Sequence, residues 1–221
     1  MKETPLIILG AGKSTIEFID LVNDINQKSY DKIKVIGILD DDKKLKNKKI
    51  NNVSVIGSIK DTKQFKKEKF FVGMFSYKNR FIRSKIINSL KFSRNKFINV
   101  IHPNSVISNK SKIGYGCLIS NNCNIYANSK LYNFCNLSPN VSLAPFSMVN
   151  DNCFLGNGVL IASKSKVEKN TYIGFGSSVL ENIKVKEGSR IMPTTVVSKN
   201  ITSKKAIVFG TPSRLIGFEK Y

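Results

Sequence analysis

Aliphatic residues recur at every sixth position from Ile101 to Val197. The column contains seventeen residues and keeps one phase without a gap. A period of six fits neither an α-helix nor a simple alternating strand, whose periods are about 3.6 and 2.0 residues. It fits a coil of three short parallel strands, each of which points one aliphatic side chain at a common axis. The sequence therefore predicts a parallel β-helix solenoid.

Small residues form a second column, four positions after each aliphatic residue. Between Ser105 and Thr195, thirteen of the sixteen positions hold Ser, Cys or Thr, which suits the inside of a tight corner. The exceptions are Val141, Val159 and Ile183. Three glycines directly follow an aliphatic residue, where we predict a turn with positive φ: Gly114, Gly156 and Gly174.

All four cysteines lie in the small-residue column, at Cys117, Cys123, Cys135 and Cys153. Three of them are eighteen residues apart, so they are expected to stack on successive coils, about 4.8 Å from one another. A linear stack without a nearby histidine does not make a tetrahedral zinc site. A reducing cytosol disfavours disulfides. We interpret these residues as structural thiols and expect no metal.

The first forty residues show the pattern of a nucleotide-binding α/β unit. A buried strand is predicted at residues 6–9, followed at once by Gly10-Ala11-Gly12 and by an amphipathic helix from about Ser14 to Ile25. A second strand at residues 34–39 ends in three aspartates, residues 40–42. Strand, glycine turn, helix, strand and acid cluster together predict the front half of a Rossmann-like unit.

The glycine turn is suited to a phosphate, because glycines allow close backbone approach and a helix N-terminus carries a positive dipole end. The third glycine position of G-x-G-x-x-G holds Thr15, so the fingerprint is incomplete. The turn also resembles the end of a P-loop. Ile7 occupies the position of the required earlier glycine, which disfavours ATP hydrolysis.

The remaining segments complete a two-domain plan. A third strand is predicted at residues 70–74, and a basic helix with an apolar face follows at about residues 81–90. We place the domains at residues 1–98 and 99–221. After Val197 the six-residue register ends, and the tail is expected to cover the open β edge of the last coil.

The chain is strongly basic, with 36 Lys and Arg against 15 Asp and Glu and a formal net charge of +21. This charge favours anionic partners. It is spread along the chain rather than focused, which disfavours nucleic acid as a partner. No run of apolar residues is long enough to predict a membrane span. No signal peptide is recognisable, so a cytoplasmic location is expected.

Three short motifs, in this order, resemble a known family. They are Gly-Ala-Gly with the Ile-Leu-Asp-Asp-Asp strand end, Ile-His-Pro-Asn-Ser at residues 101–105, and Val-Phe-Gly-Thr-Pro-Ser-Arg at residues 208–214. Together they resemble the sialic acid O-acetyltransferase and UDP-4-amino-sugar N-acetyltransferase family. The resemblance covers the whole chain. It implies a left-handed β-helix, a homotrimer, acetyl-CoA as the donor and a nucleotide-linked amino sugar as the acceptor.

The resemblance also implies positions for the two ligands. The sugar nucleotide of that family lies on the N-terminal domain, and the matching positions are Gly10, Gly12, Lys13, Ser14, Asp40 and Asp41. Acetyl-CoA lies in the groove between neighbouring β-helices, and the matching positions are Phe154, Ser163, Ser178 and Arg214. Lys13 stands where the family usually has glycine, and its charge suits a pyrophosphate.

The catalytic position departs from the family pattern. The resemblance implies a histidine base two residues after an aliphatic of a central repeat, with an acid next to it. In register from Leu143 these positions hold Pro145 and Phe146, and Ser138 replaces a family asparagine. The one histidine, His102, matches a structural position at the start of the solenoid. Neither Pro nor Phe can accept a proton.

The missing base favours an amine over a hydroxyl as the acceptor, because a hydroxyl needs a base to become nucleophilic. An amine with a pKa of about 8 is already partly neutral at pH 7. The leading hypothesis is acetyl-CoA-dependent N-acetylation of a nucleotide-linked amino sugar for surface glycan synthesis. One alternative is an inert member that binds a nucleotide sugar or acts as a trimeric scaffold. Another is proton transfer by Asp151 or Asn140 of a facing subunit.

Overall fold

The computed structural model describes residues 2–90 and 92–220. The chain divides into two compact units, Met1–Pro103 and Asn104–Tyr221. We call them the N-terminal unit and the β-helix unit.

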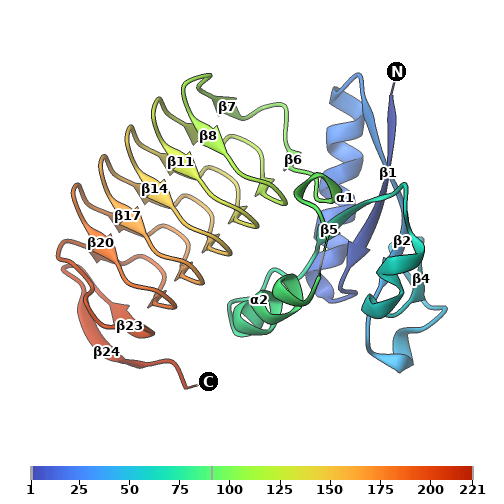
Figure 1. Cartoon of the computed structure of the whole chain (residues 1–221). Helices are drawn as coiled ribbons and strands as arrows, with labels where there is room; N and C mark the ends of the chain where they lie inside the picture. Colours follow the sequence, from blue (N-terminus) through green and yellow to red (C-terminus); the bar gives the residue numbers. More distant parts are fainter. Residues whose placement is uncertain (1, 91, 221) are drawn as a thin grey trace. The chain divides into compact units, whose positions relative to one another are not determined.

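The N-terminal unit is built on one sheet of mainly parallel strands (Figure 1). Its strands are β1 (Glu3–Leu9), β2 (Lys32–Leu39), β3 (Lys49–Ile50), β4 (Val53–Gly57) and β5 (Lys69–Val72). They lie in the order β3-β4-β2-β1-β5, in which only the pairing of β3 with β4 is antiparallel. The first β-strand therefore lies inside the sheet, between β2 and β5, as expected for a strand of four consecutive aliphatic residues that is buried on both faces.

Helix α1 (Lys13–Lys28) joins β1 to β2 and covers the sheet with its apolar side. The Phe18 ring of α1 stacks on the Phe71 ring of β5, with centroids 4.4 Å apart and planes 5° from parallel. Residues 6–9 of β1 are fully buried beneath this layer. Burial of side chains of this size contributes about 1.5–3 kcal/mol each to stability.

The other helical elements of the unit are short. They are η1 (Lys43–Leu45), η2 (Ile59–Gln64), η3 (Tyr77–Asn79), α2 (Arg80–Ser89) and η4 (Arg94–Lys96). The 3₁₀-helix η2 begins with a capping box, in which the side chains of Ser58 and Asp61 each accept from the other's backbone N–H. Sequence analysis missed β4 as a strand because its five residues follow a basic loop.

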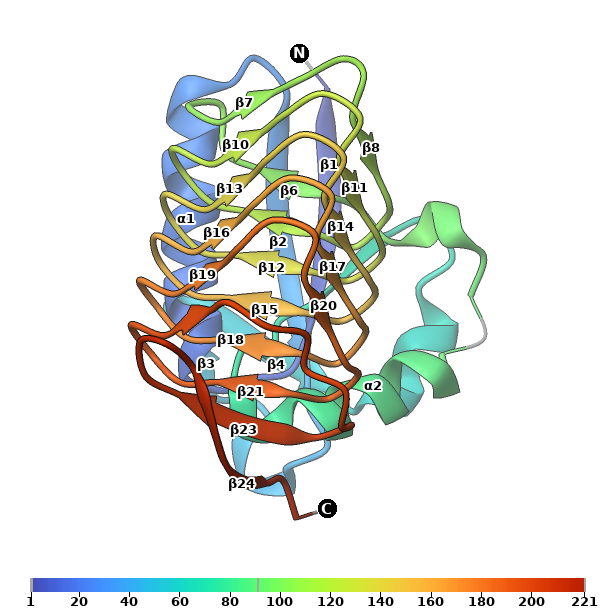
Figure 2. The same cartoon turned by 90° about the vertical axis from the view of Figure 1, so that its left-hand side faces the viewer.

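The β-helix unit consists of two-residue strands wound into three flat sheets (Figure 2). After β6 (Val100–Ile101), face 1 contains β9 (Leu118–Ile119), β12 (Asn136–Leu137), β15 (Phe154–Leu155), β18 (Tyr172–Ile173) and β21 (Arg190–Ile191). Face 2 contains β7 (Val106–Ile107), β10 (Asn124–Ile125), β13 (Ser142–Leu143), β16 (Leu160–Ile161), β19 (Ser178–Val179) and β22 (Val196–Val197). Face 3 contains β8 (Lys112–Ile113), β11 (Lys130–Leu131), β14 (Met148–Val149), β17 (Lys166–Val167) and β20 (Lys184–Val185).

The six-residue register predicted from the sequence is confirmed. Every strand from β6 to β22 ends on a member of the aliphatic column, and strands eighteen residues apart pair in parallel. From Leu137 to Val197 the column is fully buried, whereas its first three members are only half-buried at the open end of the coil.

The small-residue column lies inside the corners, as predicted, and also ties the coils together. The Ser177 hydroxyl donates to the Met192 carbonyl at 2.9 Å, and the Cys135 thiol lies 3.0 Å from the Asn150 carbonyl. Burial raises the pKa of the Cys123 thiol to about 11. The four cysteines are free and buried, and no group of His, Cys, Asp and Glu in the described ranges could hold a metal.

The prediction that Gly114, Gly156 and Gly174 adopt positive φ is wrong. Positive φ occurs two residues later, at a position that recurs every six residues from Gly116 to Thr194 and usually holds Asn or Gly. The three glycines are required for another reason, namely close approach of the next coil. A Cβ on Gly174 would lie 2.5 Å from the Pro193 backbone nitrogen.

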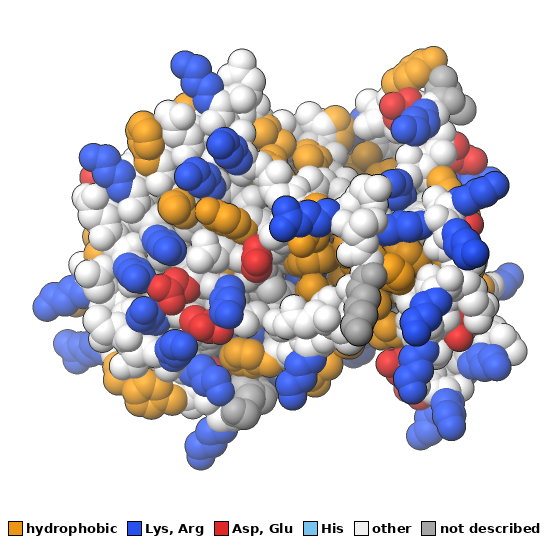
Figure 3. All heavy atoms as spheres, viewed as in Figure 1, with side chains coloured by type: hydrophobic (Ala, Val, Ile, Leu, Met, Phe, Trp, Pro, Cys, Tyr) orange, Lys and Arg blue, Asp and Glu red, His pale blue; other side chains and the backbone are white. Residues whose placement is uncertain are grey.

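The tail covers the end of the β-helix, as predicted. Strand β23 (Ala206–Phe209) adds in parallel to β21, and β24 (Arg214–Phe218) pairs antiparallel with β23. Many Lys and Arg side chains stand on the surface of the molecule (Figure 3). Among the described residues, no helix has the length and apolar character needed to cross a membrane.

We predict that Gly174→Ala lowers the free energy of unfolding by about 1–3 kcal/mol, because the new methyl group meets backbone atoms that cannot rotate away. Gly217→Ala is the matched control, since no atom lies within 4 Å of its added Cβ. Urea unfolding followed by circular dichroism measures both variants. Equal stability of the two would contradict this explanation of the glycine.

Candidate functional site

A cleft of about 390 Å³ opens in the N-terminal unit, where β1 leads into α1. It is lined by Gly10, Gly12, Lys13, Ser14, Glu17, Asp40, Met74, Phe75, Ser76 and Asn79. The carboxyl ends of three parallel strands meet here, since Gly10 N donates to Leu39 O and Gly73 N donates to Leu9 O. Ligands of open α/β sheets bind at this edge.

Five of the six residues predicted to bind the sugar nucleotide line this cleft: Gly10, Gly12, Lys13, Ser14 and Asp40. Asp41 does not. Its Oδ1 accepts a hydrogen bond of 2.9 Å from the Ile59 backbone N–H at the start of η2, so its carboxylate organises that turn.

Two of the lining side chains are already engaged in shaping the glycine loop. Asp40 Oδ2 accepts from the Ala11 N–H at 2.6 Å, and its Oδ1 accepts from the Asp42 N–H at 2.8 Å. The Ser14 hydroxyl donates to the Gly73 carbonyl at 3.0 Å. These bonds connect the loop after β1 to the ends of β2 and β5 and hold it open.

Thr15, at the third glycine position of the fingerprint, is fully buried. Its Oγ1 donates to the Gly10 carbonyl at 2.8 Å. The threonine therefore closes the loop internally with a hydrogen bond. Lys13 and Glu17 are exposed at the cleft, where they offer one positive and one negative charge to a ligand.

Sequence analysis missed the second wall of the cleft, formed by residues 74–79 after β5. Gly10 has φ of 104°, and a Cβ there would lie 2.8 Å from Met74 Cγ, so the two walls are in close contact. The signal available was positional: parallel strands bring their carboxyl ends together, so the residues after the third strand belong to the same site.

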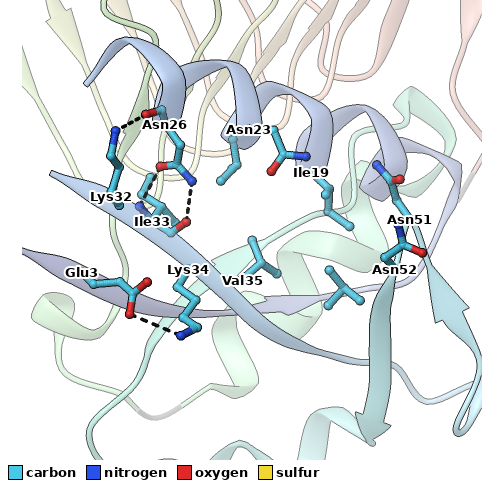
Figure 4. A pocket seen from close by; sticks show the side chains of 12 residues that line it. Glu3, Ile19, Asn23, Asn26, Lys32, Ile33, Lys34, Val35, Asn51 and Asn52 are labelled. Atoms are coloured by element: carbon cyan, nitrogen blue, oxygen red, sulfur yellow. Dashed lines mark hydrogen bonds and ion pairs between the residues drawn. The ribbon is translucent and has the colours of Figure 1, made fainter. Parts of the chain in front are cut away.

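A second cavity of about 450 Å³ lies between α1 and β2, beside the turn between β3 and β4 (Figure 4). Its polar groups bind one another. The Asn26 side chain makes two hydrogen bonds of 2.8 Å with the Ile33 backbone, and Lys34 lies 3.4 Å from Glu3. No sequence pattern indicates this cavity, because its lining comes from four separate elements.

The position that the family resemblance assigns to the catalytic base lies at the corner between faces 2 and 3. The Pro145 carbonyl accepts from the Lys164 N–H of the next coil at 3.3 Å. Phe146 adopts φ of 64° and its side chain is 55% exposed. A bulky residue in the left-handed region is strained. No imidazole or carboxylate belongs to these two residues.

The other candidates for proton transfer lie at different corners. Ser138 and Asn140 follow β12, at the corner after face 1, whereas Asp151 follows β14, at the corner after face 3. Asp151 Oδ1 accepts from the backbone and side-chain N–H groups of Asn133, at 2.8 and 3.0 Å. One chain therefore does not bring Asp151 to the corner of Pro145.

The residues predicted to bind acetyl-CoA are also distributed over several faces. Ser163 lies one coil beyond Pro145, at the same corner, and Ser178 lies on face 2 in β19. Phe154 lies on face 1, where its ring stacks on that of Tyr172 with centroids 5.4 Å apart. Arg214 begins β24 in the tail. Within a single chain these four residues do not form one site.

His102 has a structural contact within the N-terminal unit. Its Nε2 lies 2.7 Å from Asp24 Oδ2 of α1, and its side chain is fully buried. Hydrogen bonds from Lys28 and then from His102 lower the pKa of Asp24 below its ordinary value. This pair connects the last segment of the N-terminal unit to its first helix.

The architecture is supported by similarity to solved structures and not by sequence matches to known proteins. No protein-family model matches the chain. No curated protein matches it either. Solved structures do match, and those with high TM-scores include an N-acetyltransferase and an acetyltransferase domain.

Three of these structures span nearly the whole chain. A mutant of perosamine N-acetyltransferase from Caulobacter crescentus, in complex with CoA and GDP-perosamine, matches with a TM-score of 0.81 and 18% identity, covering 96% of this chain and 97% of that one. The acetyltransferase domain of PglB from Neisseria gonorrhoeae FA1090, in complex with acetyl coenzyme A, has a TM-score of 0.80 and 19% identity, with coverages of 97% and 100%. WeeI from Acinetobacter baumannii AYE has a TM-score of 0.78 and 20% identity, with coverages of 97% and 100%.

At these identities the matches show the fold. They agree with the resemblance found in the sequence, and the many short parallel strands fit a left-handed β-helix of the acyltransferase type.

We predict that Asp24→Asn lowers the thermal midpoint at neutral pH, and that the difference from the unsubstituted protein closes as pH falls below about 4. The sign follows from the depressed pKa of Asp24 in the folded state: the charged form contributes stability above the unfolded pKa and loses it on acidification. Glu17→Gln removes an equal charge from the same helix and is the control. A difference that does not change with pH would contradict the role of the carboxylate.

Proposed function

We propose that this protein transfers an acetyl group from acetyl-CoA to the amine of a nucleotide-linked amino sugar. The observation that carries the proposal is the cleft at the glycine loop, lined by five of the six predicted residues, in a chain whose two units both match sugar acetyltransferases. One of those matched proteins is in complex with CoA and GDP-perosamine, and another with acetyl coenzyme A.

In this proposal the N-terminal unit is Rossmann-like and binds the nucleotide. The exposed Lys13 side chain supplies a cation for the pyrophosphate beside the start of α1. Helix α1 has no acidic residue in its first turn and no side-chain cap, so its positive end is not neutralised there.

The proposed chemistry relies on the environment of the amine in place of a general base. Ala144, Pro145 and Phe146 form an apolar corner, and removal of an ammonium group from water lowers its pKa. Lys164, one coil on in the same column, adds a positive charge that acts in the same direction. The amine is then neutral near pH 7 and attacks the thioester carbonyl once both are positioned. The carbon–sulfur bond breaks, CoA leaves as the thiolate, and the proton lost from the nitrogen passes to that thiolate or to water.

Self-association completes the proposed acetyl-CoA site, because its predicted residues lie on separate faces of one chain. Face 2 carries the exposed apolar side chains that a contact between copies would bury: Val106, Tyr126, Leu160 and Leu180, at 67%, 50%, 41% and 42% exposure. In the proposed homotrimer, Ser163 of one copy and Phe154 of the next contribute to the same acetyl-CoA site.

An inert binding protein is the second candidate, favoured by one observation. Phe146 stands where the family resemblance implies an acid. Phe154, nine residues after Pro145, stands where it implies a second histidine, and its ring stacks on Tyr172. In this candidate the two rings occupy the space of the acetyl group. This candidate predicts stabilisation by nucleotide sugars in a thermal-shift titration and none by CoA.

We predict that the protein releases free thiol from acetyl-CoA when it is given GDP-, UDP- or TDP-linked amino sugars. Matched sugar nucleotides with a hydroxyl in place of the amine are the control and are expected to give no release, because no base activates a hydroxyl. A thiol-reactive dye follows the reaction. The proposal would be refuted if thiol were released only with the hydroxyl acceptors, or if none of the acceptors in the panel caused release.

We also predict that Phe146→Asn raises the free energy of unfolding by about 1 kcal/mol, since Asn tolerates positive φ and the ring is mostly exposed. The same change is expected to reduce acetyl transfer, because it opens the apolar corner to water.

Phe134→Asn is the matched contrast for this change. Phe134 also has positive φ, of 56°, but it is buried and packs edge-on against Tyr115 at 5.1 Å. Its replacement is expected to destabilise the protein. Denaturant titration and thiol release separate the two effects, and a Phe146→Asn variant that is less stable or equally active would contradict the interpretation.

A further inference from the structure

Lysines occupy the outward position of four of the five strands of face 3. Each strand of the β-helix has one inward aliphatic residue and one outward residue before it. On face 3 the outward residues are Lys112, Lys130, Met148, Lys166 and Lys184. They are eighteen residues apart, so they form a straight column along about 19 Å of the coil axis, at about 4.8 Å per coil.

The strand register sets these lysines directly opposite one another. Lys112 pairs with Lys130 across β8 and β11, and Lys166 pairs with Lys184 across β17 and β20. Like charges at directly opposite positions destabilise a sheet. The face therefore carries an electrostatic cost that a neutral outward residue would avoid.

The other two faces carry no lysine at the outward position of a strand. On face 2 the outward residues of β7 to β22 are Val106, Asn124, Ser142, Leu160, Ser178 and Val196. On face 1 the outward residues of β9 to β21 are Leu118, Asn136, Phe154, Tyr172 and Arg190. A chain rich in lysine for reasons of composition alone would place it at outward strand positions of all three faces, whereas here it holds such positions on face 3 only.

Most of this charge is not neutralised by carboxylates. Glu168 lies 3.3 Å from Lys184 and 3.5 Å from Lys186, and both of these ion pairs are at one end of the face. For Lys112, Lys130 and Lys166, the described part of the chain provides no carboxylate within ion-pair distance. The positive charges of three of the four lysines in the column are therefore available to an anionic partner.

We propose that face 3 docks on the surface of a membrane that contains anionic lipids. The region over β8, β11, β14, β17 and β20 carries many Lys and Arg side chains (Figures 1 and 3). Tyr132, which is 39% exposed at the end of β11, and Met148 stand among the lysines. Lysines attract anionic headgroups, and tyrosine favours the interface between headgroups and acyl chains.

The geometry favours lipid over nucleic acid. A nucleic acid strand binds in a basic groove with aromatic rings on which its bases stack. Face 3 is a flat sheet with a single line of charge. Lipid headgroups diffuse laterally and can therefore adjust to a fixed line of cations. The phosphates of a nucleic acid have a fixed spacing, which would have to match the spacing of the lysines. This proposal does not depend on acetyl transfer. If both hold, acetyl transfer takes place at the membrane surface.

The test compares the unsubstituted protein with a variant that carries Lys112→Gln, Lys130→Gln, Lys166→Gln and Lys184→Gln. Co-sedimentation is measured with vesicles of phosphatidylcholine alone and of phosphatidylcholine mixed with phosphatidylglycerol, at physiological ionic strength. We expect binding to the mixed vesicles only, weakened by higher salt. Each lysine near an anionic surface contributes about fivefold, so the variant is expected to bind on the order of a hundredfold more weakly or worse.

The control variant removes the same charge elsewhere, with Lys43→Gln, Lys44→Gln, Lys46→Gln and Lys48→Gln in the basic loop after β2. It is expected to retain most of the binding. The face 3 variant is expected to unfold at the same temperature as the unsubstituted protein or higher, because the opposed like charges are gone.

Several results would overturn the proposal. They are no binding to the mixed vesicles, or an equal loss of binding in both variants. Equal affinity for single-stranded RNA, with the same dependence on the four lysines, would assign the face to a nucleic acid instead.

Discussion

The hydrogen bonds between successive coils are the interaction on which the β-helix unit depends. Each two-residue strand pairs with the strand eighteen residues on, and side chains in the corners add bonds to the carbonyl groups of the next coil, as Ser177 does to Met192. Such short strands have no stability alone. The stacked coils bury a continuous aliphatic column, and that column fixes the register of everything outside it.

Because the register is fixed, each outward position along the axis is an independent choice of side chain. The chain uses this freedom differently on two of its faces and at one corner. Face 3 carries a line of lysines, face 2 carries exposed apolar residues such as Leu160, and the corner at Phe146 carries a strained aromatic ring. The stability of the coil comes from its buried side chains. A destabilising feature on its outer surface is therefore best explained by a role in binding.

The sequence predicted the β-helix better than the N-terminal unit, for a physical reason. The repeat places an aliphatic residue at seventeen equivalent positions. The inward orientation of any one of them, such as Leu143, therefore follows from the others in the column. The cleft has no such redundancy. Asp40 and Asp41 are adjacent and chemically alike, and only the position of η2 decides that Asp41 binds the Ile59 N–H while Asp40 lines the cleft. Gly174 shows the same limit, because its role depends on the backbone of Pro193 in the next coil.

The absence of a base at Pro145 and Phe146 has a consequence for which acceptors the proposed reaction can use. With no proton acceptor at these two positions, the nucleophile of the proposed reaction loses its proton through its own pKa and its surroundings. An apolar corner assists an ammonium group, whose neutral form it favours, and it hinders a hydroxyl, whose charged form it disfavours. In the proposed reaction, Pro and Phe at these positions therefore exclude a hydroxyl acceptor and still allow an amine. A corner of this kind selects its acceptor by charge as well as by shape.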